Sequence, residues 1–181
     1  MGHMIYFARH GQTVWNVENK ICGASESELT ELGFQQAEEL AEKIKSSGIH
    51  IDEILYSPLI RAKDTALTIS RATGIPARPE MRIKEQNFGY WEGTPRDGQD
   101  FAEDKKNFIK SYGTGESMFR LAQRVYNLLD ELKADDSGKT YLLVAHNGIA
   151  RIVESYFRDM TNEEFARFGI RNCDLREYHF S

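Results

Sequence analysis

Two short groups of charged and polar residues in this sequence combine the residue types of a reactive site. Arg9-His10-Gly11 directly follows the apolar run 4–8, and His146-Asn147-Gly148 directly follows the apolar run 140–145. Histidine can act as a nucleophile or exchange protons near neutral pH, and the planar fork of arginine fits phosphate oxygens. A single histidine would be interpreted as a satisfied loop or core residue, but the repeated pattern indicates a site for an anion such as phosphate.

The two apolar runs predict buried strands that carry these residues to a common place. In open α/β sheets, ligands bind just beyond the carboxyl ends of the strands, so the arginine and both histidines are expected at one edge. Another strand is expected at 51–56, and Ser57-Pro58 after it predicts a helix with serine as N-cap. That start places Arg61 in the first turn, near the same edge. Gly11 allows the backbone to approach a ligand closely.

Helix-like and strand-like stretches alternate along the chain, which predicts an α/β fold. We expect one domain over residues 1–181, with three layers (α/β/α), a mostly parallel central sheet and helices on both faces. Residues 14–27 are expected to be irregular. A helix capped by Thr30 is expected next, with Phe34, Ala37, Leu40, Ala41 and Ile44 on its buried face. An edge strand is expected within 77–83, and a last strand at 175–180. Two further helices are expected, a long one capped by Ser117 and a short one with a Thr161–Glu164 capping box.

The composition excludes several classes of protein. The net charge of −5 argues against a nucleic-acid-binding domain, which would usually be basic. No apolar run approaches the length of a membrane span, and no signal-peptide pattern precedes the first expected strand, so we expect a cytoplasmic protein without a membrane partner. The two cysteines imply neither a disulfide framework nor a zinc motif. The sequence leaves the oligomeric state open.

Together the polar residues can perform phosphoryl transfer. Neutral imidazole is a nucleophile, and attack of His10 on phosphorus would give a phosphohistidine whose developing charge the arginines and His146 would stabilise. The leaving alkoxide then needs a proton, and Glu85, just before the aromatic loop 86–95, is the candidate acid. Spacing alone leaves an ordinary surface carboxylate as an equally good interpretation of Glu85.

The order of these motifs resembles the histidine phosphatase superfamily, also called the phosphoglycerate mutase-like family. A lone Arg-His-Gly triplet would be weak support, whereas the ordered set covers nearly the whole chain and is specific. The matching blocks are Arg9-His10-Gly11 with Asn16, Leu29-Thr30 with Gly33, Ser57-Pro58-Leu59 through Arg61-Ala62, Glu85 with Phe88-Gly89, Gly115-Glu116-Ser117, and His146.

The resemblance implies a role for each matched residue. His10 is expected to be the phosphorylated nucleophile, and Glu85 the proton donor that later activates water. Arg9, Arg61 and His146 are expected to form the phosphate pocket. No cofactor and no metal are expected, because the flanking arginines would repel a cation. Further substrate-binding residues are expected to be Asn16, Gly11, Thr13, Cys22, Gly23 and Asn147.

The sequence favours the phosphatase branch of this family over the mutases. Cys22 stands where mutases generally carry a threonine, and Phe88 stands where they carry a substrate-contacting tyrosine. No adjacent arginine pair occurs between positions 93 and 117. Two alternatives stay open: a cofactor-dependent phosphoglycerate mutase, and a non-catalytic phosphate-binding module. The presence of both His10 and Glu85 speaks against the binding module.

Residues 94–116 are expected to form a specificity insertion that lies over the pocket as a lid. Arg96, Lys105, Lys106 and Tyr112 are its side chains that could reach a leaving group, although a solvated face is the simpler interpretation of the lysine pair. The expected substrate is the phosphomonoester of a small metabolite, for instance a sugar phosphate, phosphoserine, phosphoglycerate or α-ribazole phosphate.

Overall fold

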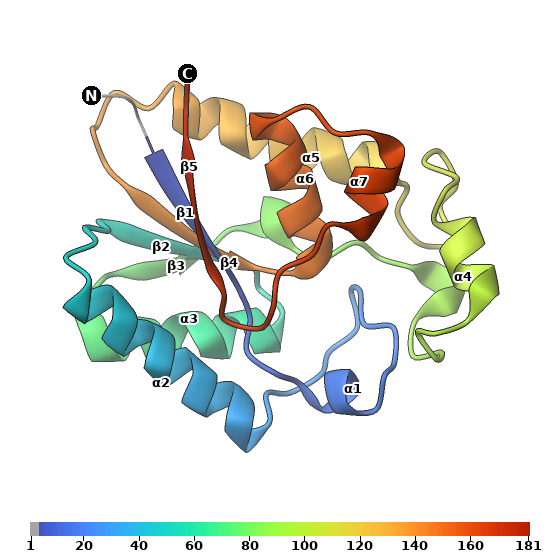
Figure 1. Cartoon of the computed structure of the whole chain (residues 1–181), viewed down its shortest axis with the longest axis horizontal. Helices are drawn as coiled ribbons and strands as arrows, with labels where there is room; N and C mark the ends of the chain where they lie inside the picture. Colours follow the sequence, from blue (N-terminus) through green and yellow to red (C-terminus); the bar gives the residue numbers. More distant parts are fainter. Residues whose placement is uncertain (1–3) are drawn as a thin grey trace.

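Five strands build a central sheet whose pairing brings the ends of β1 and β4 side by side. The computed structural model describes residues 4–181. The strand order is β3-β2-β4-β1-β5, and all neighbours are parallel except β1 and β5 (Figure 1). Arg9 pairs with Ala145 at the end of the β1–β4 register, so a histidine follows each strand at the same edge. The strands are β1 (Met4–Arg9), β2 (Glu53–Tyr56), β3 (Ala77–Pro79), β4 (Tyr141–Ala145) and β5 (Leu175–His179).

Helices cover both faces of this sheet, which confirms the α/β fold expected from the sequence. Successive residues of a strand point to opposite faces, so one set of strand side chains packs on α5 and α6 and the alternate set packs on α2 and α3 (Figure 1). Because β1 and β4 are covered on both faces, they are buried along most of their length and have continuous apolar sequences. The four helices are α2 (Glu31–Ser46), α3 (Ile60–Thr73), α5 (Met118–Lys133) and α6 (Asn147–Phe157).

Side-chain caps start three of the helices where the sequence places them. The hydroxyl of Thr30 accepts a hydrogen bond from the first turn of α2, and Ser117 does the same for α5. Thr161 and Glu164 form the expected capping box of α7 (Asn162–Arg167). The expected buried face of α2 is wrong at Phe34, which is 39% exposed. Gly33 takes the buried position instead.

The expected serine cap of α3 is wrong. The helix begins at Ile60, and the amide of that residue donates to the carboxylate of Glu26 at 2.8 Å, so a distant side chain caps it. Ser57 still extends the sheet, because its amide donates to the carbonyl of Val144 at 3.0 Å. The first turn nevertheless carries Arg61, as expected.

The remaining segments lie outside the two helix layers. The expected edge strand is confirmed only in its first half, because the side chain of Glu80 accepts from the amide of Arg82 and starts the short 3-10 helix η1 (Met81–Ile83). The stretch expected to be irregular contains one turn of helix. No helix within residues 4–181 is long and apolar enough to cross a membrane. The further elements are α1 (Val14–Val17), the 3-10 helix η2 (Gly89–Trp91) and α4 (Gln99–Asp104).

Replacement of Gly33 by alanine is expected to destabilise the protein by up to about 2 kcal/mol. A Cβ atom there would lie 2.2 Å from the carbonyl oxygen of Gln12, so the loop after β1 must shift. Overpacking of this kind costs about 1–3 kcal/mol or more, and the better helix propensity of alanine returns about 1 kcal/mol. Urea denaturation measures the change. Gly98→Ala is the control, because its Cβ would meet nothing closer than 3.8 Å.

Candidate active site

The residues after β1 and β4 meet others from across the chain around one small cavity. Its free volume is about 30 Å³, which is room for a compact group rather than a whole metabolite. Eight of the nine lining side chains belong to the expected catalytic and substrate-binding residues, and the ninth, Arg96, is one of the insertion side chains expected to reach a leaving group. The expected residue His146 is not among the lining side chains. The lining residues are Arg9, His10, Thr13, Asn16, Cys22, Arg61, Glu85, Arg96 and Asn147.

His10 is held as a neutral imidazole with one free ring nitrogen. Its Nδ1 lies 2.7 Å from the carbonyl oxygen of Gly11, and because a carbonyl can only accept, Nδ1 carries the proton. Within residues 4–181, Nε2 has no hydrogen-bond partner and keeps its lone pair. Burial of the ring, followed by the charges of Arg61 and Arg9, lowers the pKa of His10 well below 6.5. The ring is therefore neutral at pH 7 and can act as a nucleophile through Nε2.

The second histidine lies against the first. The ring centroids of His10 and His146 are 5.3 Å apart, and His146 Nε2 is 2.6 Å from the hydroxyl of Ser57. Its Nδ1 is buried without a partner in the described part of the chain. Burial and then the charge of Arg61 lower the pKa of His146 well below 6.5, so it too is neutral at pH 7. A neutral ring with an unused polar atom can donate to an anion next to His10.

Two arginines keep their charge for a ligand because main-chain carbonyls, rather than carboxylates, hold them. Arg61 donates to the carbonyls of Ser25 and Gly23 at 2.8 and 2.6 Å, and Arg9 donates to that of Ile170 at 2.8 Å. Neither forms an ion pair with any carboxylate among residues 4–181. Burial lowers the pKa of Arg9 to about 10, which leaves it charged at pH 7. The cavity therefore has a strongly positive lining that suits phosphate.

Glu85 is fixed at the amino end of α6. One carboxylate oxygen accepts from the amide of Gly148 at 3.0 Å, and the other accepts from the amide of Gln86 at 2.9 Å. The approach needs a glycine, since a Cβ at position 148 would lie 2.4 Å from Glu85 Oε1. The side chain is buried, so the structure excludes the surface interpretation of this carboxylate.

The smaller residues expected to bind substrate have structural contacts as well. Thr13 and Asn16 form a reciprocal capping box for α1, and the side chain of Asn147 accepts from the amide of Ile170. Gly11 and Gly23 do not line the cavity. They instead supply the carbonyls that orient His10 and Arg61.

Cys22 places a protonated thiol at the cavity. Burial raises the pKa of this thiol to about 11, and Sγ lies 3.5 Å from the carbonyl oxygen of Ser25. A neutral thiol is a weak donor and a poor nucleophile. Cys22 thus offers the cavity a weak donor and no reactive thiolate.

Three residues that support the site were not identified from the sequence. Ser57 had been expected to cap a helix and contacts His146 instead. Asn172, in a loop near the end of the chain, donates to the carbonyl of His10 at 2.9 Å, and no local sequence pattern predicts this contact. Burial lowers the pKa of Arg151 on α6, and the charge of Glu85 opposes that shift. Only the position of Arg151, on the second turn of the helix after His146, could have indicated from the sequence that it lies near the site.

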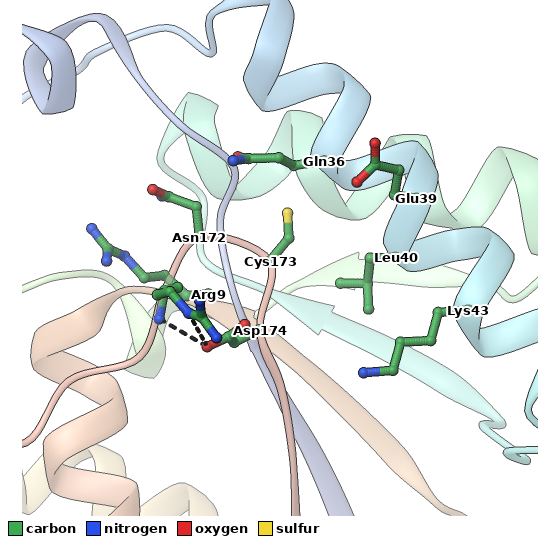
Figure 2. A pocket seen from close by; sticks show the side chains of 9 residues that line it. Arg9, Gln36, Glu39, Leu40, Lys43, Asn172, Cys173 and Asp174 are labelled. Carbon is green, nitrogen blue, oxygen red and sulfur yellow. Dashed lines mark hydrogen bonds and ion pairs between the residues drawn. The ribbon is translucent and has the colours of Figure 1, made fainter.

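Another cavity, larger than the candidate site, lies beside Arg9, and neither His10 nor His146 lines it. It measures about 630 Å³, and Figure 2 shows side chains of both signs around it. Asp174 there is paired with Arg171 at 3.6 Å, and Cys173 has a pKa raised to about 12 by burial. Mixed charges and an unreactive thiol offer no reacting group, so the smaller cavity is the candidate site. The lining residues are Arg9, Gln36, Glu39, Leu40, Lys43, Arg171, Asn172, Cys173 and Asp174.

Acidification is expected to destabilise the protein well before its carboxylates titrate. Both buried histidines have folded-state pKa values below 6.5, so the unfolded chain binds more protons as the pH falls through that value. The free energy of unfolding should therefore fall by up to about 1.4 kcal/mol per pH unit for each histidine between about pH 6.5 and pH 5. Urea denaturation across this range measures the slope, and His146→Asn should reduce it. A flat or rising stability would contradict the prediction.

The comparisons agree with this geometry. The sequence model of the histidine phosphatase superfamily (branch 1) matches residues 5–181. A Yersinia pestis protein named probable phosphoglycerate mutase GpmB is 33% identical over 178 residues, which cover 94% of this chain and 82% of that protein. The mycobacterial glucosyl-3-phosphoglycerate phosphatase superposes with a TM-score of 0.82 at 26% identity, covering 98% of this chain and 90% of its own. Bacillus stearothermophilus YhfR superposes with a TM-score of 0.83 at 26% identity, covering 97% and 90%.

The family match extends over nearly the whole chain, one relative is named a probable phosphoglycerate mutase, and the solved phosphatase shares the fold. The chain therefore belongs to the histidine phosphatase superfamily, branch 1.

Proposed function

We propose that this protein is a metal-independent phosphatase that hydrolyses the phosphomonoester of a small metabolite through a phosphohistidine on His10. The observation that carries the proposal is the neutral His10 ring, whose Nδ1 is held by the Gly11 carbonyl and which shares one small cavity with Arg9, Arg61 and Glu85. These groups supply a nucleophile, charge stabilisation and an acid in a single place.

In the first step, the lone pair of His10 Nε2 attacks phosphorus and the bond from phosphorus to the ester oxygen breaks. Arg9, Arg61 and His146 stabilise the charge on the other phosphoryl oxygens. Glu85, in its carboxylic acid form, gives its proton to the leaving oxygen, so the alcohol departs neutral. The Gly11 carbonyl accepts the Nδ1 proton throughout and stabilises the positive charge that the ring acquires.

In the second step, water replaces the alcohol. The Glu85 carboxylate takes a proton from the water while its oxygen attacks phosphorus, and the bond from phosphorus to Nε2 breaks. His10 returns to its neutral state, phosphate leaves, and Glu85 is again protonated. The cavity side chains include no carboxylate besides Glu85, and the surrounding cations would repel a metal ion, so the proposed reaction uses none.

Phosphatase activity is favoured over mutase activity by the residues around Glu85. Phe88 is buried against Phe101 and Tyr112 and offers no hydroxyl to a substrate, and Cys22 offers only a weak donor. A mutase must hold its substrate while the phosphoryl group returns to a second hydroxyl, and each missing polar contact would cost about 1–3 kcal/mol. The mutase remains the second candidate, because the name of the Yersinia pestis relative is that of a probable phosphoglycerate mutase.

The partner in this proposal is a small phosphorylated metabolite rather than a nucleic acid or a membrane. Both cysteines are free thiols, which fits the reducing cytoplasm that we propose as the compartment.

Hydrolysis of p-nitrophenyl phosphate in EDTA tests the proposal, run beside 3-phosphoglycerate with 2,3-bisphosphoglycerate present. Release of phosphate without added metal supports the phosphatase. Rapid interconversion of 3- and 2-phosphoglycerate with little free phosphate would establish the mutase instead. Absence of both reactions, together with phosphate binding, would point to a non-catalytic module.

A further inference from the structure

The two buried histidines of the site differ in what determines the position of the ring proton. The Gly11 carbonyl beside His10 can only accept, so it places the proton of that ring on Nδ1. His146 instead contacts the hydroxyl of Ser57, which lies 2.6 Å from Nε2 and can either donate or accept. The single proton of the neutral His146 ring can therefore lie on Nε2 or on Nδ1, and the other contacts of Ser57 decide between the two.

The hydroxyl of Ser57 has one donor and one acceptor as its neighbours. Its oxygen accepts from the amide of Leu59 at 3.4 Å. In the described part of the chain, no acceptor other than Nε2 of His146 forms a hydrogen bond with this hydroxyl. Ser57 is also fully buried, so bulk water does not reach it. The hydroxyl proton is therefore satisfied only if it points to His146.

One of the two possible arrangements satisfies both atoms of this contact. With the ring proton on Nε2, the ring would donate to Ser57, and the hydroxyl proton would be buried without an acceptor, at the full cost of its desolvation. With the ring proton on Nδ1, the hydroxyl donates to the lone pair of Nε2 and still accepts from the amide of Leu59. The second arrangement leaves one buried polar group fewer without a partner, so we expect the proton on Nδ1.

The surroundings of His146 Nδ1 fit a donor that lacks its acceptor. The atom is buried and has no hydrogen-bond partner among residues 4–181. His146 is the N-cap residue of α6, where a side-chain acceptor can take a hydrogen bond from an amide of the first turn, yet its ring takes none. An oxygen of a phosphoryl group bound beside His10, whose ring centroid is 5.3 Å away, would supply the missing acceptor.

We propose that Ser57 is a positioning residue, which holds the ring proton of His146 on Nδ1 and so lets this histidine donate to the phosphoryl group during its transfer to His10. The inference rests on the proposed function, in which His146 stabilises phosphoryl charge, and it adds the group that determines which ring nitrogen is protonated. The opposite tautomer would offer a lone pair to the phosphoryl oxygens and repel them. Ser57 acts through His146 and does not touch the substrate.

Nitrogen-15 NMR of the imidazole rings tests this assignment without turnover, because protonated and unprotonated ring nitrogens have well-separated chemical shifts. At pH 7, His146 is expected to show a protonated Nδ1 and an unprotonated Nε2, and the His146→Asn variant identifies its signals. In Ser57→Ala, both nitrogens should share the proton. A proton on Nε2 in the wild-type protein, or a proton that stays on Nδ1 in Ser57→Ala, would overturn the proposal.

Two further variants separate this role from a structural one. Ser27 is a matched control, because it is also a buried serine whose hydroxyl accepts from an amide, that of Trp15 at 3.0 Å. Ser27→Ala should leave the ring-nitrogen shifts of His146 unchanged. Ser57→Cys keeps the shape of the side chain with a weaker donor, and it should move the proton in the same direction as Ser57→Ala but less far. It replaces Ser57→Ala if that variant does not fold.

Kinetics should show the same dependence on His146. Ser57→Ala is expected to lower kcat for p-nitrophenyl phosphate about tenfold or more and to change KM less than about threefold, because the arginines that bind the phosphoryl group remain. In the His146→Asn background, the same substitution should change kcat less than about twofold, since Ser57 then has no ring to orient. Losses that simply multiply would show that Ser57 acts on another part of the protein, and would overturn the proposal.

The two proposals fail in different ways. If p-nitrophenyl phosphate is not hydrolysed, the proposed function fails, and the ring-nitrogen shifts still decide the tautomer of His146. Hydrolysis by a protein whose His146 carries its proton on Nε2 would leave the phosphatase intact and remove the role of Ser57. Inorganic phosphate provides a last check, because its binding should move the signal of the Nδ1 proton in the wild-type protein. Saturation with phosphate that leaves this signal in place would contradict the donor role.

Discussion

The His10→Ala variant is expected to lose phosphatase turnover by a factor on the order of 10³ or more, because no other group at the cavity can take over as nucleophile. His146 is the nearest alternative, but its Nε2 is engaged with Ser57 at 2.6 Å and its Nδ1 is buried. Assay of p-nitrophenyl phosphate hydrolysis measures the loss. Mass spectrometry of samples quenched without acid, which would hydrolyse phosphohistidine, should detect this modification on His10 in the wild-type protein and none in the variant.

The controls separate lost chemistry from lost structure. His50→Ala removes an exposed histidine that contacts only Asp52, and it should retain full activity. The His10→Ala variant should still bind inorganic phosphate, since Arg9 and Arg61 are held by carbonyls that do not involve the imidazole. Turnover in His10→Ala close to that of the wild-type protein would contradict the phosphohistidine mechanism.

The sequence was sufficient wherever local pattern and strand order determine position. The two apolar runs became the adjacent strands β1 and β4, and their register placed His10 and His146 with ring centroids 5.3 Å apart. That outcome follows from the rule that parallel strands present their carboxyl ends at one edge. The fold class and most of the cavity lining could therefore be predicted without coordinates.

The sequence did not predict side-chain contacts where two partners were available to the same side chain. Ser57 satisfies the usual preference for a helix cap, yet its hydroxyl contacts His146, and Glu26 caps the helix from another segment. Lys105 and Lys106 are neighbours in the sequence, yet the ammonium group of Lys105 lies 5.1 Å from the centre of the Phe101 ring and Lys106 forms an ion pair with Glu103. These choices depend on residues far apart in sequence, which periodicity cannot reveal.

The Glu85→Gln variant is expected to separate the two steps of the proposed reaction. For an alkyl phosphate, the leaving alkoxide needs a proton, so loss of the acid should lower kcat by about 10²- to 10⁴-fold. For p-nitrophenyl phosphate, the leaving phenolate is a stable anion, so phosphorylation of His10 should slow much less. The second step uses Glu85 as the base for either substrate. The aryl ester should therefore give a burst of about one p-nitrophenolate per enzyme, followed by slow turnover.

A matched control shows whether the difference between alkyl and aryl esters, and the burst, result from loss of proton transfer. Glu92 is another carboxylate near the site, but it only accepts main-chain hydrogen bonds, from the amides of Gly23, Ala24 and Phe88. Glu92→Gln should affect alkyl and aryl substrates equally and give no burst, because it changes loop geometry and not a proton donor. Phosphohistidine should accumulate in Glu85→Gln with the aryl ester and not with the alkyl ester. Equal losses for both esters in Glu85→Gln, without a burst, would mean that Glu85 positions the site and that another group or water supplies the proton.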